Sequence, residues 1–150
     1  MDQRGLRGSA SARIDEKGRL KVPTIFRGLV HAQAGPDVFV TSLTSECVRI
    51  YPMDVWLEIE KKALEIPNNL PSRLKFLDRM NFFGQAGELD GQGRVVIPQL
   101  LREHAAIVGD VCVIGRINHL EVWNLERFVA KLRSEPWEDA DGLKLSEFGV

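Results

Sequence analysis

Apolar and polar side chains alternate in a short stretch near the start of the chain, between a polar turn and a proline. In an extended segment Leu20 and Val22 point to one side, and Arg19 and Lys21 point to the other. The glycine of the preceding turn can adopt a positive φ without a Cβ clash. The proline that follows suits the first position of a helix. Residues 15–27 therefore predict a turn, a half-buried strand and a short helix.

The same pattern returns 75 positions later. Residues 90–102 match residues 15–27 at the aspartate and glycine of the turn, the arginine after it, the inward apolar positions, the proline and the closing arginine. Neither half has enough strands to bury an apolar face alone. The repeat therefore predicts two similar units that pack around a pseudo-twofold axis into one barrel-like core.

The remaining pattern predicts hairpins and helices around the two motifs. The expected strands after Ala10–Ile14 form two hairpins, 38–41 with 47–51 and 110–113 with 121–123. The expected helices lie at 53–65, 71–82 and 125–133, the last capped by Asn124. We divide the chain into a first repeat (6–66), a helical linker (67–84), a second repeat (85–134) and an acidic C-terminal tail (135–150). Residues 1–9 are expected to be mobile, and the tail to be loosely held.

Composition adds a charge asymmetry to this picture. The 150 residues are 44% hydrophobic and 27% charged, with a net charge of −1. Residues 1–27 hold seven basic and three acidic side chains, whereas residues 133–150 hold two basic and five acidic ones. No apolar run reaches the ~20 residues that span a bilayer, and no secretory signal opens the chain. We therefore expect a cytoplasmic protein without a membrane partner, and we expect Cys47 and Cys112 to remain thiols.

Arg19 and Arg94 occupy the same place in the two copies and are the main candidates for chemistry. Each guanidinium could contact phosphate oxygens or a guanine edge in DNA. Alternatively, each could form a structural ion pair with the aspartate four residues earlier, Asp15 or Asp90. Recurrence within a basic segment favours the DNA role for Arg19.

The two copies differ in charge. The first gathers four cations, which are Arg13, Lys17, Arg19 and Lys21. The second has Gln92 and Val96 where two of those lysines stand. Since phosphate contacts dominate affinity, we expect the first copy to bind DNA and the second to serve mainly as scaffold or subunit contact. In both copies the turn glycine, Gly18 or Gly93, has a structural role.

Enzymatic interpretations find little support in the sequence. The segment 91–93 lacks the third glycine and the βαβ context of a dinucleotide fingerprint. The three histidines, His31, His104 and His119, show no metal-ligand spacing. We expect no catalytic residue, no metal, no cofactor and no small-molecule substrate. Trp56 and Trp123 are expected to anchor the core.

The doubled motif and its flanks resemble the MraZ family of bacterial transcriptional regulators, within the wider AbrB/MazE-like group of DNA-binding proteins. The residues that carry the resemblance are Gly8, Asp15, Gly18, Arg19, Val22, Pro23, Tyr51, Pro52, Trp56, Asp90, Gly93, Arg94, Leu101, Arg102, Glu121, Val122 and Trp123. They span roughly residues 6–130. The resemblance implies an α+β fold in which two tandem AbrB-like (swapped-hairpin) repeats form a pseudo-twofold double-split β-barrel with flanking helices.

The resemblance also implies a function. MraZ-like proteins are expected to bind repeated short elements of double-stranded promoter DNA in the division and cell-wall gene cluster, as ring-like homo-oligomers associated with the nucleoid. Resemblance carries the DNA-binding role onto both Arg19 and Arg94, with Asp15 and Asp90 orienting them. The alternative, from another class of protein, is an AbrB-like antitoxin or interaction module whose tail binds a protein partner.

Overall fold

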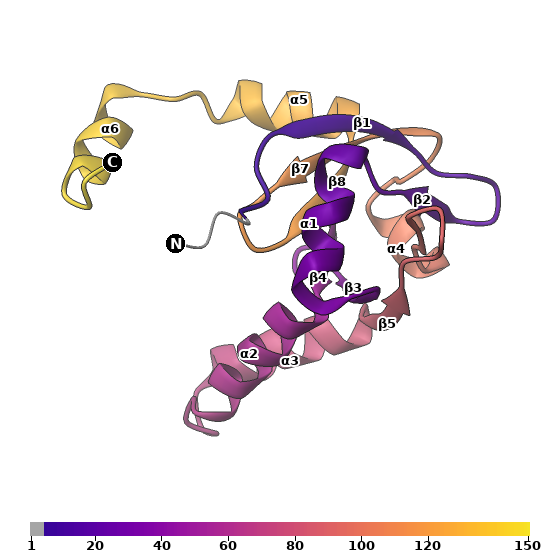
Figure 1. The fold of residues 1–150 in the computed structure, drawn as a ribbon. Helices are drawn as coiled ribbons and strands as arrows, with labels where there is room; N and C mark the ends of the chain where they lie inside the picture. Colours follow the sequence, from indigo (N-terminus) through magenta and orange to yellow (C-terminus); the bar gives the residue numbers. More distant parts are fainter. Residues whose placement is uncertain (1–4) are drawn as a thin grey trace.

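Residues 5–150, apart from the side chains of residues 33 and 34, are described by a computed structural model (Figure 1). This part of the chain is α+β, with eight strands and six helices. The strands are β1 (Ser9–Arg13), β2 (Arg19–Lys21), β3 (Asp37–Thr41), β4 (Val48–Pro52), β5 (Gln85–Glu88), β6 (Arg94–Val96), β7 (Asp110–Gly115) and β8 (Leu120–Asn124). The helices are α1 (Thr24–Ala34), α2 (Met53–Leu64), α3 (Pro71–Phe82), α4 (Gln99–His104), α5 (Leu125–Ser134) and α6 (Asp139–Ser146).

Most elements form where the sequence pattern predicts them. β3 and β4 form one antiparallel hairpin, and β7 and β8 form the other. Helices α2, α3 and α5 begin at the predicted residues and end within one residue of the predicted limit. The predicted cap of α5 is confirmed, because the Asn124 side chain accepts a hydrogen bond of 3.1 Å from the backbone N–H of Arg127.

The two halves of the chain exchange strands. One antiparallel sheet has the order β1-β7-β8-β4-β3-β5. In it β1 pairs with β7 of the second hairpin, and β5 pairs with β3 of the first hairpin. The motif strands β2 and β6 form a separate two-stranded ribbon. Strands β1 and β5 remain edges of the larger sheet, so the pairings of the described residues do not close it into a barrel.

The inward side chains of both motifs meet in one core. Leu20, Val22, Val95 and Ile97 are each at most 1% exposed and belong to the same hydrophobic cluster. Alternation in β2 and β6 thus places the apolar face of each motif as the sequence predicts. Leu101 of the second copy is also fully buried in this cluster, so it serves the core.

Helices α2 and α3 form an arm that projects from the sheet (Figure 1). Trp56 of α2 stacks on Phe39 of β3 with ring centroids 4.4 Å apart. Met80 of α3 is buried, and its carbonyl accepts a hydrogen bond of 2.6 Å from the buried hydroxyl of Thr41. These contacts fix the base of the arm. The expected anchoring role of both tryptophans is confirmed, since Trp56 is 2% and Trp123 is 4% exposed.

The start of the described chain differs from the sequence expectation. Residues 5–9 are not free: Leu6 is fully buried and exchanges two backbone hydrogen bonds with Ile117, at 2.8 and 2.7 Å. Residues 1–4, also expected to be mobile, lie outside the described part. The tail forms helix α6, closed by a reciprocal capping box between Glu138 and Asp141. It extends away from the sheet (Figure 1) with exposed side chains.

Candidate nucleic-acid interface

Asp15 organises the first motif turn. Its Oδ1 accepts hydrogen bonds from the backbone N–H groups of Lys17, at 3.0 Å, and Arg19, at 2.8 Å. Its Oδ2 accepts one from Nε of Arg19 at 2.7 Å. Gly18 completes the turn with a φ of +81°. The hydrogen bond from the Arg19 backbone is the main cause that lowers the pKa of Asp15, followed by the Arg19 side chain.

The second turn repeats this geometry. Oδ1 of Asp90 accepts from the backbone N–H groups of Gln92, at 2.8 Å, and Arg94, at 2.9 Å, while Oδ2 accepts from Nε of Arg94 at 2.8 Å. Gly93 has a φ of +74°. The hydrogen bond from the Arg94 backbone is the main cause that lowers the pKa of Asp90 to about 2. Both arginines are therefore held by ion pairs at one nitrogen, which fixes the direction of each guanidinium.

Two further arginines lock the turns together across the halves. Arg102 of α4 lies over the first turn, where a Cβ on Gly18 would be 2.7 Å from its Cζ. Arg27 of α1 lies over the second turn, where a Cβ on Gly93 would overlap its Nε. Our sequence analysis assigned no role to these arginines. Their equivalent places at the end of each repeated motif were the available signal.

The structure brings three of the candidate cations onto one face of the β2–β6 ribbon. In its antiparallel register Lys21 lies opposite Arg94, and Arg19 lies opposite Val96. Leu20 and its partner on β6, Val95, point into the core. The side chains of the two flanking pairs therefore share the outward face. Two copies that are 75 residues apart in sequence thus contribute to a single surface.

The other two candidate cations lie outside this face. Lys17 is exposed in the turn that leads into β2. Arg13 is on β1 of the larger sheet, where its Nε lies 3.7 Å from Oδ1 of Asp110, and both side chains are largely exposed. We call the outward face of Arg19, Lys21, Arg94 and Val96 the ribbon face.

A buried acidic group joins the two hairpins. Glu121 on β8 is 7% exposed and pairs in the strand register with Arg49 on β4. Burial alone raises its pKa, but His119 at 3.5 Å, the Trp123 indole N–H at 2.9 Å and the charges of Arg116 and Arg49 outweigh burial and lower the pKa to about 2. His119 also stacks on an aromatic ring of β4, with centroids 4.7 Å apart. Glu121 therefore has a structural ion-pair network around it.

Cys47 and Cys112 are both free thiols, as expected. Burial raises the pKa of Cys47 to about 12. Within residues 5–150 no three His, Cys, Asp or Glu side chains gather in a way that could hold a metal ion. The helices of the same residues include none with both the length and the apolar character needed to cross a membrane.

Comparison with known proteins places these features in a family. Residues 83–141 match the family described as "MraZ protein, putative antitoxin-like". The chain is 44% identical to a protein of Acidobacterium capsulatum over 144 residues, which cover 96% of this chain and 99% of that protein. It is 42% identical to a protein of Koribacter versatilis over 96% of this chain and 99% of the relative.

A third relative, from Hydrogenovibrio crunogenus, is 38% identical over 94% of this chain and 93% of its own length. All three relatives carry the name transcriptional regulator MraZ. The matches run through both motifs and nearly the whole chain, so this chain belongs to the MraZ family.

Proposed function

We propose that this protein is a sequence-specific, DNA-binding transcriptional regulator, which binds repeated short promoter elements of the division and cell-wall gene cluster. The names of its relatives support a role in transcription. The observation that carries the DNA-binding part is the ribbon face, where Arg19, Lys21 and Arg94 lie together on a two-stranded antiparallel ribbon.

The dimensions of such a ribbon suit DNA. The major groove of B-DNA admits a two-stranded β-ribbon, and arginine is the side chain that most often contacts guanine. In the described chain the aspartates bond Arg19 and Arg94 through Nε. The Nη groups of each guanidinium then supply the paired donors that the O6 and N7 atoms of guanine accept. Lys21 and Lys17 would neutralise phosphates beside them.

The proposed assembly is a ring-like homo-oligomer. Each chain in it would contain two AbrB-like repeats, residues 6–66 and 85–134, which together form one double-split barrel. The exchange of β1 and β5 between the hairpins supports this interpretation of the repeats. Multivalency also supports it, because one small basic patch binds weakly and linked patches raise avidity. The protein would act in the cytoplasm, associated with the nucleoid.

The test is a titration of the full chain with a short fluorescent duplex selected from a random-sequence library, read by anisotropy. Arg19→Ala should weaken binding about 5- to 150-fold, which corresponds to the ~1–3 kcal/mol of a good base contact. Arg94→Ala should weaken binding less, since Gln92 and Val96 replace two lysines of the first copy. Arg133→Ala removes an exposed cation from α5, away from the ribbon, and serves as the matched control.

Two outcomes would refute the proposal. One is that selection enriches no duplex. The other is that Arg133→Ala weakens binding as much as Arg19→Ala, because the ribbon face would then have no special part in recognition. Equal losses from Arg19→Ala and Arg94→Ala would refute only the expected difference between the two copies.

The second candidate function is an antitoxin or protein-interaction module, which the antitoxin-like description of the matching family favours. In that case the tail would bind a protein partner. Removing residues 135–150 separates the two functions, since a DNA-binding protein keeps its salt-sensitive binding to the selected duplex without them.

A further inference from the structure

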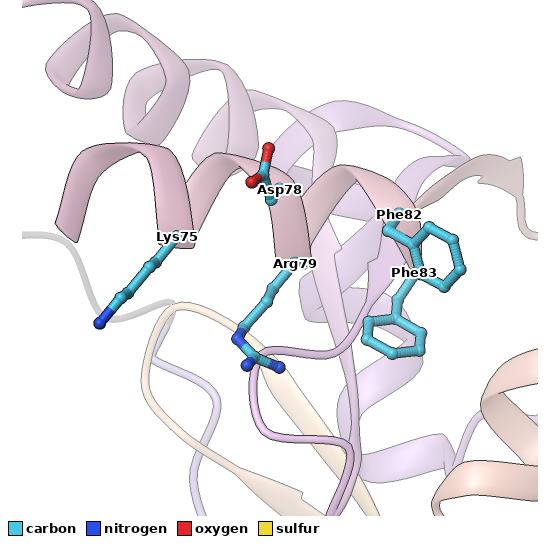
Figure 2. Close-up of a pocket in the computed structure, with 5 residues that line it drawn as sticks. All are labelled: Lys75, Asp78, Arg79, Phe82 and Phe83. Atoms are coloured by element: carbon cyan, nitrogen blue, oxygen red, sulfur yellow. The ribbon is translucent and has the colours of Figure 1, made fainter. Parts of the chain in front are cut away.

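Helix α3 presents a basic face outside the ribbon. Lys75, Arg79 and Phe82 follow one another at spacings of four and three residues, so they share one side of the helix. Figure 2 shows the side chains of Lys75 and Arg79 extending to the same side, while Asp78 points away from them. Together with Phe83 these residues line a hollow of about 500 Å³.

The same face is also apolar. Phe82 is 72% exposed on this face, and Leu74, 60% exposed, lies on the neighbouring side of the helix beside Asp78. Lys75 and Arg79 border a second hollow, which Leu43 and Phe76 line next to the β3–β4 turn. Exposed aromatic side chains beside arginine are the composition enriched at protein interfaces. Such a face on the arm is suited to an acidic, partly apolar protein segment.

The C-terminal tail has the complementary composition. Residues 135–150 contain five acidic side chains and one lysine. Large apolar side chains are interspersed among them and largely exposed, at 69% for Trp137, 73% for Leu143 and 79% for Phe148. A capping box between Glu138 and Asp141 closes the first turn of α6. The tail therefore offers an acidic and apolar surface, and the capping box lowers part of the entropic cost of ordering it on docking.

We propose that the tail of one copy, residues 135–150, binds the α3 face of a second copy. Within one chain the tail leaves from α5 and points away from the arm (Figure 1). A contact between two different surfaces of identical chains is heterologous, and it generates a ring when the rotation closes. The proposal rests on the homo-oligomer in the proposed function, for which it names the contacting surfaces, and it is independent of DNA binding.

Charge reversal on the arm tests this contact. The double variant Lys75→Glu with Arg79→Glu is measured by light scattering of the full chain at several protein concentrations. Its mass should fall below that of the wild-type assembly, because acidic groups would then face each other. The matched control is Lys61→Glu with Lys62→Glu, which makes the same charge change at exposed positions of α2 and should keep the wild-type mass.

Charge reversal on the tail is the second part of the test. Asp139→Lys with Glu147→Lys leaves the capping box intact and should also lower the mass. The quadruple variant, with both surfaces reversed, should recover the assembly because attraction is restored. Circular dichroism checks that each variant is folded.

Other results overturn the proposal in distinguishable ways. If the reversed arm and the reversed tail both keep the wild-type mass, chains assemble through other surfaces and only this contact is wrong. If the quadruple variant does not recover the mass lost in the double variants, the two surfaces do not pair with each other. If the wild-type chain is a monomer at every concentration, the homo-oligomer itself is refuted, while DNA binding by the ribbon face is still judged by its own titration.

Discussion

Alanine substitutions at four glycines test the interlocked turns. Gly18 and Gly93 have positive φ values, and an added Cβ at either would meet an arginine of the other half. Gly109 has a φ of +62° with nothing within 4 Å of the added Cβ. Gly91 is likewise open and has no positive φ. The series thus separates the cost of backbone conformation from the cost of displacing an arginine.

The expected costs follow from these environments. A left-handed φ costs a residue with a Cβ roughly 1–2 kcal/mol, which is the whole cost expected for Gly109→Ala. In Gly18→Ala the Cβ would also displace Arg102, whose Nε donates a hydrogen bond of 3.0 Å to the Ile97 carbonyl. Losing that bond adds about 0.5–1.5 kcal/mol. Gly18→Ala should therefore cost about 1.5–3.5 kcal/mol.

Gly93→Ala should fall in the same range, because Arg27 donates an equivalent bond of 3.2 Å to the Val22 carbonyl. Gly91→Ala should be neutral or stabilise by up to about 1 kcal/mol, through the lower entropy of the unfolded chain.

The assay is urea unfolding at one fixed protein concentration, since self-association shifts apparent stability. The reasoning would be refuted if Gly18→Ala and Gly93→Ala cost no more than Gly109→Ala. The arginines would then lie over the turns without stabilising them. A large loss in Gly91→Ala would show instead that the turn tolerates no side chain at all, whatever its φ.

Three further predictions concern titratable groups. Glu121→Gln should destabilise the fold by roughly 1–3 kcal/mol in urea unfolding at neutral pH, because half-buried Arg49 loses its counter-charge, while solvent screens the loss at the more exposed Arg116. The pKa of Glu121 is lowered from 4.5 to about 2, so its contribution is present above pH 4.5 and is lost as the pH falls toward 2; the stability of the variant should vary less over that interval. Asp90→Asn should likewise flatten the pH dependence of stability between 3.8 and about 2, measured by acid unfolding. A thiol reagent at pH 8 should label Cys112 well before Cys47: burial raises the pKa of both thiols, but Cys47 is only 5% exposed and its pKa is raised to about 12, and mass spectrometry of the peptides reports the order.

The sequence predicted local structure well because local structure has local causes. The positive φ of Gly18, the inward direction of Leu20 and the limits of α3 follow from turn chemistry, alternation and helical spacing within a dozen residues. The repeat supports the same prediction twice, since the hydrogen bond between aspartate and arginine in the first turn recurs in the second.

Strand partners could not be predicted in the same way. The alternation of side chains in β1 predicts which of them point inward. It does not predict whether β1 pairs with a strand nearby in sequence or with one about 100 residues away. The pairing of β1 with β7 and of β2 with β6 therefore appears only in the structure. For that reason Lys21 and Arg94, assigned to copies with separate roles, turned out to be direct neighbours.

The ion pair of Glu121 with Arg49 is foreshadowed by the sequence repeat. Arg49 and Glu121 occupy corresponding places in the two hairpins and carry opposite charges. Equivalent positions near a pseudo-twofold axis can face each other, and these two do so across β4 and β8. Opposite charges at matched positions of a repeat therefore indicate a contact at its axis.

Charge segregation explains how a chain with a net charge of −1 can be proposed to bind DNA. The ribbon face would bind phosphates, while the acidic tail would bind the basic face of α3 on another copy. Salt weakens both contacts, so the salt dependence measured with the assembled protein on a long promoter combines two effects. A short duplex with one element, titrated at protein concentrations below assembly, isolates the first. Its slope, at ~0.9 per phosphate neutralised, counts the phosphates bound by one copy. The slope on the long promoter adds the phosphates bound by further copies, so the charge dependence of assembly has to be measured separately, as the change in mass with salt in the absence of DNA.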